Sequence, residues 1–417
     1  MTQIIVIGGG PAGMMAALSA AGAGAKVTLL ERNDRLGKKL RITGKGRCNV
    51  CNDCEPEAVI RAVPGNGKFL YGALMRFTPG DVMAFFEHQG VPLKTERGRR
   101  VFPCSDKAQD IVDALTKALQ AAGVQVRLNA RVKALKTEGT RVTGVTLYDG
   151  TFLPAEAVIV AVGGASYPGT GSTGDGNRLF QALGIKTRPL MPSLVPLVVE
   201  GPDCPAMMGL SLRNCTLTVT DETRKGKKVF EELGELLFTH FGLSGPLVLS
   251  ASAHMRPMEP GRYVCHIDTK PGLTAEKLDL RLQRDLKEGN QKSLHNSLVS
   301  LLPHSLIPVA LRRSGLAPEK RCCDVTREER QKLGHTVKDL CFSVEGFRPL
   351  EEAIVTAGGI DLGEIDPRRM QVKKWDNLFA AGEMLNVDAY TGGYNLQIAF
   401  STGRLAGESA AETGEIR

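Results

Sequence analysis

Hydrophobic and polar positions near the N-terminus predict a strand, a helix and a second strand in close succession. Residues 4–7 form a continuous apolar run, which is typical of a strand buried in a parallel sheet. A glycine-rich turn follows, and the small and apolar residues of 12–23 predict a helix. A second apolar run at 26–30 predicts the next strand. We therefore expect the chain to open with a β-α-β unit.

Two apolar runs much further along the chain resemble strands of the same sheet. Residues 158–162 run into Gly163 and Gly164, and residues 378–381 run into Gly382 and Glu383. After the second run, a helix is expected to begin near residue 395. Because both runs end at glycines, plain turns of an α/β sheet are the alternative interpretation.

The region between these strands predicts additional structure. Capping-box patterns begin at Thr78 and Thr326, helices are expected over 107–122 and 274–288, and a hairpin-like flap precedes residue 158. Prolines near residue 190 mark a boundary, after which short alternating runs predict a small β-domain. The expected divisions are a first sheet domain at 1–190, an inserted β-domain at 191–271, an inserted helical subdomain at 272–338, a return through the β-domain at 339–355, and the end of the sheet domain at 356–417.

Composition indicates an ordinary globular protein of two or three domains. The chain has 417 residues, of which 42% are hydrophobic and 24% charged. Ten cysteines are too few for a disulfide scaffold, so we expect a reducing, cytoplasmic setting. The apolar N-terminus lacks a basic segment and is interrupted by glycines, which fits neither a signal peptide nor a membrane span. Composition leaves the oligomeric state open.

Basic residues are clustered rather than evenly spread. Lys and Arg number 53 against 45 Asp and Glu, a net charge of +8. Such clusters suit an anionic cofactor or RNA, although a solvated face is an equally good interpretation. The densest groups lie at 32–47, 97–100, 224–228 and 368–374.

The N-terminal β-α-β unit carries the pattern of a dinucleotide site. Gly8, Gly10 and Gly13 fit G-x-G-x-x-G, in which the first glycine makes the turn, the second admits a pyrophosphate and the third allows the helix to pack on the strand. Glu31 follows the second strand, where a carboxylate can accept hydrogen bonds from ribose hydroxyls. Strand, turn, helix, strand and acid together predict a bound dinucleotide.

The later segments favour FAD over a nicotinamide. Residues 155–176 resemble the strand that closes the sheet of FAD-binding domains, and residues 377–407 resemble their C-terminal motif. In that motif an acidic residue bonds the ribityl chain and a helix N-terminus faces the flavin. No second G-x-G-x-x-G follows a strand, so NAD(P)H is expected to dock transiently as the reductant.

Five separated segments resemble one known family. They are GKKLRITGKGRCN, VGGASYPGTGSTGDG, LFTHFGLSGP, AIVTAGGI and AGEMLNVDAYTGGYNLQIAFSTG. Together they resemble the BaiN/YhiN-like family of bacterial flavoproteins, also labelled NAD(P)/FAD-dependent or aminoacetone-oxidase-type, over nearly the whole chain. The resemblance implies an α/β fold: a Rossmann-type FAD domain of the two-dinucleotide-binding type with an inserted small β-domain and an inserted helical subdomain.

The resemblance also implies which residues bind the cofactor and what reaction they serve. Members of the family are associated with reducing a C=C bond conjugated to a carbonyl, in a steroidal bile-acid intermediate or in uracil of ribosomal RNA. The expected substrate is therefore a small-molecule enone or ribosomal RNA. The residues expected at FAD are Gly8, Gly10, Ala12, Gly13, Glu31, Arg32, Lys39, Gly44, Gly46, Arg47, Cys48, Asn49, Val132, Gly163, Gly382, Glu383, Gly393, Asn395 and Leu396.

Reduction of an enone needs a group that protonates the α-carbon and stabilises the developing oxyanion. Tyr167, Tyr390 and Tyr394 lie beside glycines expected at the flavin, and we take them as catalytic candidates together with Cys48. His240 is a further candidate, but its apolar surroundings favour a packing role.

Three cysteines in GKGRCNVCNDC allow alternative chemistries. Cys48, Cys51 and Cys54 supply only three ligands and Cys104 lies far away, so no metal site is expected. A redox dithiol of Cys48 and Cys51 is an alternative, because Lys45 and Arg47 would lower a thiol pKa. The chain would then be a thiol–disulfide flavoprotein reductase. A third alternative is an RNA-associated flavoprotein with little turnover.

Overall fold

The computed structural model describes residues 1–413 and divides them into two compact units. The sheet unit comprises Met1–Ser193 together with the chain from Pro349 onward, and the inserted unit comprises Leu194–Arg348. Within the described residues, the structure contains no helix that is both long and apolar enough to cross a membrane.

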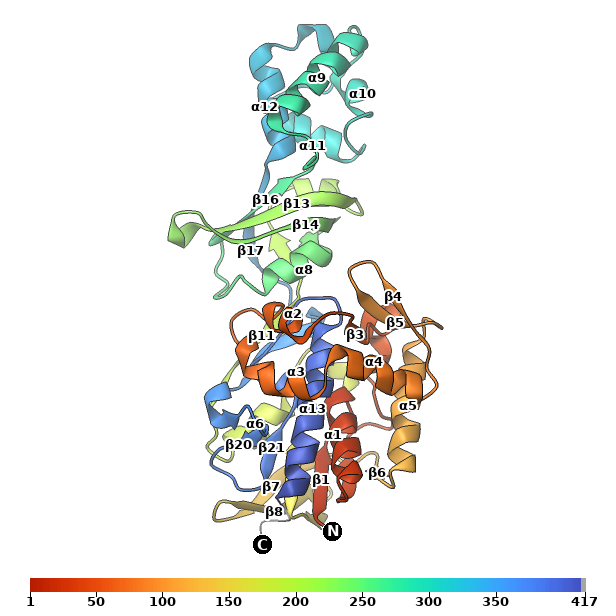
Figure 1. Ribbon diagram of the computed structural model, residues 1–417. Coiled ribbons are helices and arrows are strands. Elements are labelled where there is room, and N and C mark those ends of the chain that lie inside the picture. The colour runs from red at the N-terminus through yellow and green to blue at the C-terminus, as the bar shows by residue number, and fades with distance from the viewer. Residues whose placement is uncertain (414–417) are drawn as a thin grey trace. The chain divides into compact units, whose positions relative to one another are not determined.

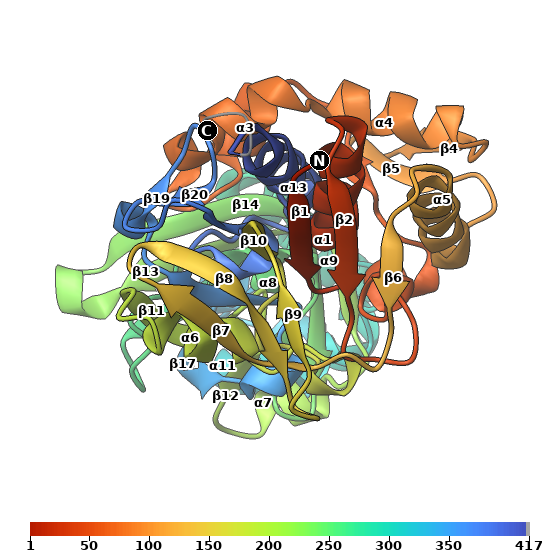
Figure 2. The ribbon, with the colours of Figure 1, turned by 90° about the horizontal axis from the view of Figure 1, so that it is seen from below.

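A seven-stranded sheet with the order β19-β20-β21-β10-β1-β2-β6 forms the centre of the sheet unit. The five strands from β21 to β6 are parallel, and β19 and β20 add an antiparallel edge. Figure 2 shows β10, β1, β2 and β6 following one another across the sheet. The α/β fold expected from the sequence is confirmed. The strands are β1 (Gln3–Ile7), β2 (Lys26–Leu30), β6 (Gln125–Arg127), β10 (Ala157–Val160), β19 (Ile365–Asp366), β20 (Gln371–Val372) and β21 (Leu378–Ala380).

Helices α1 and α13 lie side by side against this sheet (Figure 1), although they come from opposite ends of the chain. A Cβ atom at Gly403 of α13 would lie 2.3 Å from the backbone oxygen of Ala12, and one at Gly407 would lie 2.2 Å from that of Ala16. Glycine alone therefore permits this approach. The helices of the unit are α1 (Pro11–Gly22), α2 (Pro56–Arg61), α3 (Tyr71–Arg76), α4 (Pro79–His88), α5 (Ala108–Ala121), α6 (Asp175–Gln181) and α13 (Tyr394–Glu412).

Three smaller sheets complete the sheet unit. The expected flap is the antiparallel sheet β7-β8-β9, and the capping box at Thr78 is present at the start of α4. The pairing of β3 with β5 was not predicted, because β3 is only two residues long and carries no hydrophobic alternation. The strands are β3 (Cys51–Asn52), β4 (Leu93–Glu96), β5 (Arg100–Pro103), β7 (Val132–Glu138), β8 (Arg141–Leu147), β9 (Phe152–Pro154), β11 (Thr187–Ser193) and β18 (Val355–Ile360).

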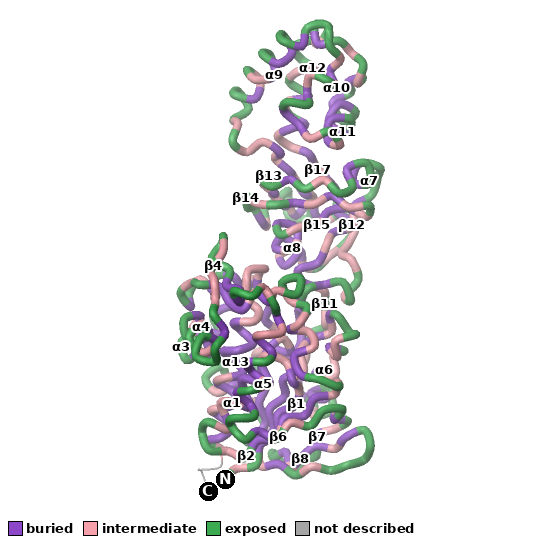
Figure 3. The backbone as a smooth tube through the Cα atoms, turned by 90° about the vertical axis from the view of Figure 1, so that its right-hand side faces the viewer, coloured by how far each residue is buried: buried purple, intermediate pink, exposed green. Residues whose placement is uncertain are grey.

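The inserted unit contains a closed barrel, β12-β15-β14-β13-β16-β17, and a group of helices with its own hydrophobic core. Buried and exposed positions alternate along its strands, and apolar faces of its helices are buried (Figure 3). The capping box at Thr326 is present. The elements are β12 (Leu197–Val199), α7 (Asp203–Ala206), β13 (Ser211–Asp221), β14 (Lys227–Thr239), β15 (Gly242–Ser244), α8 (Pro246–Ser252), β16 (Tyr263–Asp268), α9 (Ala275–Gly289), α10 (Leu294–Leu298), α11 (Leu306–Arg313), α12 (Arg327–Lys338) and β17 (Leu340–Phe347).

The unit boundaries differ from the divisions expected at residues 190 and 355. Strands β11 and β18 are antiparallel partners, with Ser193 opposite Val355 and Thr187 opposite Ile360. This pairing keeps both strands in the sheet unit, so the boundaries fall after Ser193 and after Arg348. The β-strands and helices expected to form two separate inserted divisions lie in one compact unit.

The α1–α13 approach predicts a position-specific effect of adding a methyl group. Gly403→Ala places a Cβ against the Ala12 backbone and should lower the free energy of unfolding by about 1–3 kcal/mol. Gly22→Ala, on α1 with open space around its Cβ, is the matched control and should be neutral or slightly stabilising. Urea unfolding followed by tryptophan fluorescence measures this, because the single tryptophan, Trp375, packs on the core of the sheet unit. Equal stability of the two variants would contradict the close approach.

Candidate functional site

The turn between β1 and α1 has the geometry that its three glycines predict. Gly8 has φ +108°, and a Cβ there would lie 2.4 Å from the backbone oxygen of Ala161. A Cβ at Gly13 would lie 1.8 Å from the oxygen of Gly8, which makes this residue the packing glycine. Gly10 is different, because no heavy atom lies within 4 Å of its Cβ position. The middle glycine therefore borders open space at the N-terminus of α1, where a phosphate would be favoured.

Glu31 lies at the end of β2 and is 7% exposed. Its carboxylate accepts hydrogen bonds from the backbone N–H of Gly9 at 2.7 Å and of Asn33 at 2.8 Å, and from the Asn33 side chain at 2.7 Å. The backbone oxygen of Glu31 accepts from Ala130, which brings the segment before Val132 beside it. The acid is thus fixed beside the glycine turn, as a ribose-binding carboxylate must be.

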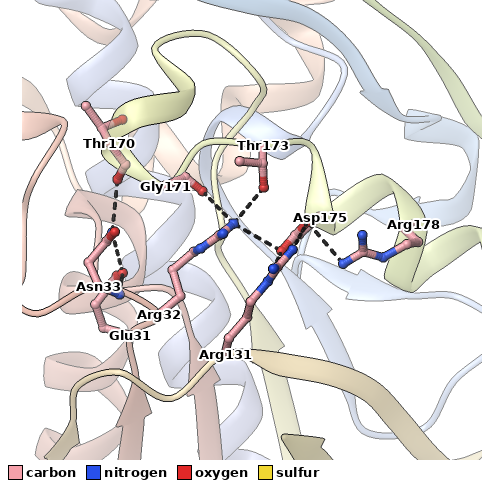
Figure 4. A network of polar contacts seen from close by, with 9 residues as sticks. All are labelled: Glu31, Arg32, Asn33, Arg131, Thr170, Gly171, Thr173, Asp175 and Arg178. Atoms are coloured by element: carbon pink, nitrogen blue, oxygen red, sulfur yellow. Dashed lines mark hydrogen bonds and ion pairs between the residues drawn. The ribbon is translucent and has the colours of Figure 1, made fainter. Parts of the chain in front are cut away.

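Arg32 braces the loop that follows β10, and Figure 4 shows its side chain directed at that loop. Its guanidinium donates to Thr173 Oγ1 at 2.7 Å, Asp175 Oδ2 at 3.2 Å and the Gly171 backbone oxygen at 3.3 Å. Asn33 donates to the Thr170 oxygen in the same loop at 3.0 Å. Arg32 was expected on the ADP half of the cofactor, and the contacts here give it a structural role.

Asp175 is the acceptor at the centre of this network. Burial raises the pKa of its carboxyl, but hydrogen bonds from Arg131 and Thr173 and the charge of Arg178 outweigh burial and lower the pKa overall. Arg131 and Arg178 approach it at 3.2 and 3.0 Å. The sequence analysis missed this network, since its members come from three separate segments.

Lys39 and Glu383 form the second polar centre of the sheet unit. Lys39 Nζ donates to both carboxylate oxygens of Glu383, at 2.9 and 2.8 Å, and to Ser166 Oγ at 2.8 Å. Glu383 Oε1 also accepts from the Thr356 backbone N–H at 2.9 Å. The Cβ position of Gly163 lies 3.7 Å from Glu383 Oε2. Residues 344 positions apart that the sequence assigned to one cofactor thus meet in space.

The segment of residues 40–48 is a 3-10 turn interrupted by left-handed residues. Gly44, Lys45 and Gly46 have φ of 57°, 58° and 85°, and Cys48 has φ 59°. Asn49 follows, and its side-chain Oδ1 is buried with no hydrogen-bond partner in the described part of the chain. An unpaired buried oxygen is costly, which indicates that a further group completes its bonding.

Strand β3, which follows this segment, packs against the glycine pair that precedes α13. A Cβ at Gly393 would lie 2.2 Å from the Cys51 backbone oxygen, and Asn52 Nδ2 donates to the Gly392 oxygen at 3.0 Å. The residues around the pair, 390–396, are half-buried between fully buried neighbours. The strand that directly follows the loop expected at the flavin is therefore in contact with the turn at the start of α13.

Asn395 and Leu396 have mainly structural contacts at the start of α13. The Asn395 side chain accepts from the Ala389 backbone N–H at 2.9 Å and donates to the Ala389 oxygen at 2.8 Å. Leu396 packs against the core, and Ala12 lies under Gly382, whose Cβ position is 2.7 Å from the Ala12 Cβ.

Arg47 and Val132 lie apart from the residues around Lys39. Arg47 donates to Glu96 and Asp106 at 2.5 and 2.6 Å, and its guanidinium lies 4.1 Å from the Phe102 ring centroid. Its charge is thus paired with two carboxylates, and its expected place at the cofactor stays a prediction. Val132 is buried at the start of β7.

Tyr167 and His240 have contrasting surroundings. Tyr167 is 37% exposed and has φ 53°, a conformation that its own loop imposes. His240 belongs to the inserted unit and packs edge-to-face on Phe241, with ring centroids 5.0 Å apart, in line with the packing role that the sequence favours.

The cysteine loop does not provide activated thiols. Burial raises the pKa of the Cys48 thiol to about 12, and a hydrogen bond with Thr43 offsets only part of that rise. Burial also raises the pKa of Cys51, and the charges of Cys54 and Asp53 add to it. The expected lowering by Lys45 and Arg47 is wrong, because Arg47 is paired with carboxylates and both thiols are desolvated. Buried thiols of this kind are poor nucleophiles.

Several observations on this chain fit FAD. Gly10 borders open space, Glu31 is held for a ribose, Asn49 carries an unpaired buried oxygen, and the start of α13 is half-exposed. Fold and site together define a Rossmann-type FAD-binding protein. More specifically, the chain belongs to the HI0933-like family, because the family described as "HI0933-like protein Rossmann domain" matches residues 2–409.

Curated relatives match the chain at full length. The chain is 30% identical over 417 residues to a 3-dehydro-bile acid delta(4,6)-reductase of Clostridium scindens, covering 99% of this chain and 100% of that protein. It is 32% identical over 400 residues to a ribosomal RNA dihydrouridine synthase of Escherichia coli, covering 95% of both. Among solved structures, the 3-ketosteroid delta1-dehydrogenase of Sterolibacterium denitrificans matches at a TM-score of 0.50 with 14% identity, covering 99% and 100% of the two chains, which indicates a shared fold.

The open space at Gly10 predicts a variant that loses the cofactor and keeps the fold. Gly10→Val suits the extended backbone there, φ −83° and ψ −178°, so its free energy of unfolding without FAD should stay unchanged. The added side chain would meet the pyrophosphate and weaken FAD binding by roughly 10- to 100-fold. FAD titration measures this. Gly13→Ala, which clashes with the Gly8 backbone, should damage both fold and binding. Unchanged FAD affinity in Gly10→Val would contradict the assignment of the turn.

Burial of the cysteine loop predicts the order in which thiols react. Iodoacetamide at pH 8 should label the exposed Cys104 and Cys323 first and leave Cys48 and Cys51 largely unmodified. Raising the pH toward 9 should speed labelling of exposed thiols while Cys48 stays protonated below its pKa of about 12. Peptide mass spectrometry over time measures this. Rapid labelling of Cys48 would restore the dithiol alternative.

Proposed function

We propose that this protein is an FAD-dependent oxidoreductase that reduces a C=C bond conjugated to a carbonyl, with electrons from NAD(P)H. The observation that carries the proposal is the pair of full-length relatives named for a delta(4,6)-reductase and for dihydrouridine formation. Chemically, both names describe adding two hydrogens across a double bond conjugated with a carbonyl. The shared reaction is therefore a stronger inference than either substrate.

The residues of this chain would hold the cofactor in two halves. The turn at Gly8 and Gly10 and the fixed carboxylate of Glu31 suit the ADP half. Lys39, Glu383 and the start of α13 suit the ribityl and ring half, and the α13 N-terminus favours negative charge there. Bound FAD would supply the hydride transfer, while this chain supplies orientation, charge and a proton.

The proton donor is proposed among the tyrosines near the glycine pair. Tyr390 and Tyr394 flank Gly392 and Gly393, and both tyrosines are half-buried. The Tyr394 ring lies 3.1 Å from the Cβ position of Gly392, so it borders the turn that contacts the cysteine loop. Tyr167 is the third candidate, in the loop after β10. A phenol in such a place can donate a proton and stabilise an oxyanion.

Ribosomal RNA is the candidate substrate that a specific surface favours. The turn joining β13 to β14 carries Arg224, Lys225, Lys227 and Lys228, all of which are exposed. The buried Asp221 lies 3.8 Å from Arg224, and the exposed Glu231 pairs with Lys228 at 3.0 Å. A net basic turn of this kind suits a phosphate backbone, whereas a steroid enone needs no such charge.

A two-step flavin assay tests the proposal. The FAD-loaded protein should bleach anaerobically with NADPH or NADH. It should recover its colour with either a 3-keto-delta(4,6) steroid or a uridine-containing ribosomal RNA fragment, and the product should gain two hydrogens by mass. Gly10→Val, measured at the same protein concentration, is the matched control and should lose turnover in proportion to its lost FAD.

Two results would count against the proposal. A protein that takes up no FAD would contradict the cofactor, and a protein whose reduced FAD neither acceptor reoxidises would contradict the reaction. Turnover of a disulfide substrate with a long-wavelength charge-transfer band would instead support the thiol–disulfide alternative. Salt-sensitive RNA binding without any flavin response would support the RNA-associated alternative.

A further inference from the structure

A compact cluster of three metal-ligating groups lies on the outer face of the barrel, wholly within the inserted unit. His266 is on β16 and Cys341 is on β17, and the two are direct cross-strand partners. Asp339 precedes β17 by one residue, so its side chain lies on the same side as that of Cys341. The three ligand atoms lie within 4.8 Å of one another, and all three residues are half-buried.

The distances within the cluster are nearly equal. Asp339 Oδ1 is 2.9 Å from His266 Nδ1, Cys341 Sγ is 3.2 Å from the same nitrogen, and Cys341 Sγ is 3.1 Å from Asp339 Oδ1. Ligand bonds of about 2.0–2.3 Å at tetrahedral angles would separate these atoms by roughly 3.3–3.6 Å. The triangle therefore needs to open by only a few tenths of an ångström to accept a metal ion.

The hydrogen bond at His266 Nε2 determines that the other ring nitrogen, Nδ1, offers its lone pair to the cluster. Thr220 Oγ1 donates its single proton to Glu222 Oε1 at 2.7 Å, and it lies 3.2 Å from His266 Nε2. The Thr220 oxygen can therefore only accept from Nε2–H, which leaves the lone pair of a neutral imidazole on Nδ1. Metal-binding histidines are oriented in this way by a partner of the other nitrogen.

Without a cation, hydrogen bonds can hold the three groups together with Asp339 as the acceptor. Nδ1–H would then donate to Asp339, and the thiol would donate to the same carboxylate oxygen. Nearby Arg313 adds positive charge, but its guanidinium is paired with the Asp203 carboxylate at 2.5 Å. When the thiol proton is released, the Cys341 thiolate and the Asp339 carboxylate give the cluster two negative charges for a divalent cation.

We propose that His266, Asp339 and Cys341 bind a zinc-like divalent cation through Nδ1, one carboxylate oxygen and the thiolate sulfur, with a fourth position open to water. Nitrogen, sulfur and oxygen ligands at these spacings suit Zn²⁺, and three protein ligands are typical of zinc sites that keep one position open. Binding releases the thiol proton to solvent. The ligands come from segments about seventy residues apart, which is why the sequence analysis, which weighed only the N-terminal cysteines, expected no metal.

Cobalt titration of the full-length, FAD-loaded protein tests this site. Difference spectra against a chelated sample should show a near-ultraviolet thiolate-to-cobalt charge-transfer band that saturates at one equivalent of Co²⁺ and is removed by Zn²⁺. Cys341→Ser should abolish the band, whereas Cys323→Ser, an exposed thiol of the same unit, is the matched control and should retain it. Thr220→Val should weaken Co²⁺ binding by roughly 10-fold or more, since it removes the partner of Nε2.

A second measurement avoids dependence on variants that fail to fold. Burial and the Asp339 carboxylate raise the pKa of the Cys341 thiol to about 12, so its alkylation is followed over long times at pH 10, where a small thiolate fraction reacts. One equivalent of Zn²⁺ should protect Cys341 of the unaltered protein from iodoacetamide under these conditions, as read by peptide mass spectrometry, and should leave Cys323 reactive. Absence of the band and of this protection would overturn the proposal and leave a cluster held by hydrogen bonds alone. A band that survives in folded Cys341→Ser would overturn it as well.

Discussion

The approach of α13 to α1 is the constraint on which the sheet unit depends. Gly403 and Gly407 have no side chain, so α13 packs directly against the backbone of α1. Segments nearly 400 residues apart therefore share one hydrophobic core. Gly382 lies against Ala12 of α1, and its N–H donates to Thr402 Oγ1 of α13 at 3.0 Å, so both helices position Gly382 and the adjoining Glu383. A loose α13 would therefore disturb both the Lys39–Glu383 pair and the turn before the helix. The geometry of the candidate cofactor site therefore depends on the packing of α13 against α1 as well as on the hydrogen bonds of the site itself.

The sequence predicted most of the sheet unit because its signals are local. A buried strand, a glycine turn and a following acid leave their pattern within thirty residues, and the structure has β1, α1, β2 and Glu31 as expected. The resemblance to a known family added Lys39, Glu383 and the glycine pair before α13 to the residues predicted at the cofactor. That Lys39 and Glu383 would pair directly could not be predicted, since only the three-dimensional fold brings them together.

Other contacts escaped prediction for physical reasons that particular residues illustrate. Lys45 and Arg47 were expected to lower the pKa of a thiol. However, Arg47 forms ion pairs with Glu96 and Asp106, which lie in distant segments, and burial is the largest influence on the pKa of Cys48. Strand β3 has only two residues, too few to leave a periodic signal, yet it fixes Cys51 against Gly393. The hydrogen bond of Arg32 to Thr173 was not predicted either, and the expected place of Arg32 at the cofactor stays a prediction. In each case the residue's contacts are with residues far away in the sequence, which a local pattern does not reveal.

The pairing of β11 with β18 has a consequence for how such a protein can diversify. These antiparallel strands carry the chain out of the sheet unit and back into it, with Ser193 opposite Val355. The two ends of the inserted unit are also neighbours, because the Arg348 N–H donates to the Pro196 oxygen at 3.0 Å. An insertion with adjoining ends can lengthen, shorten or be exchanged without threading the chain through the sheet. The inserted unit can therefore change in length and sequence while the seven-stranded sheet and the contact of α1 with α13 are kept.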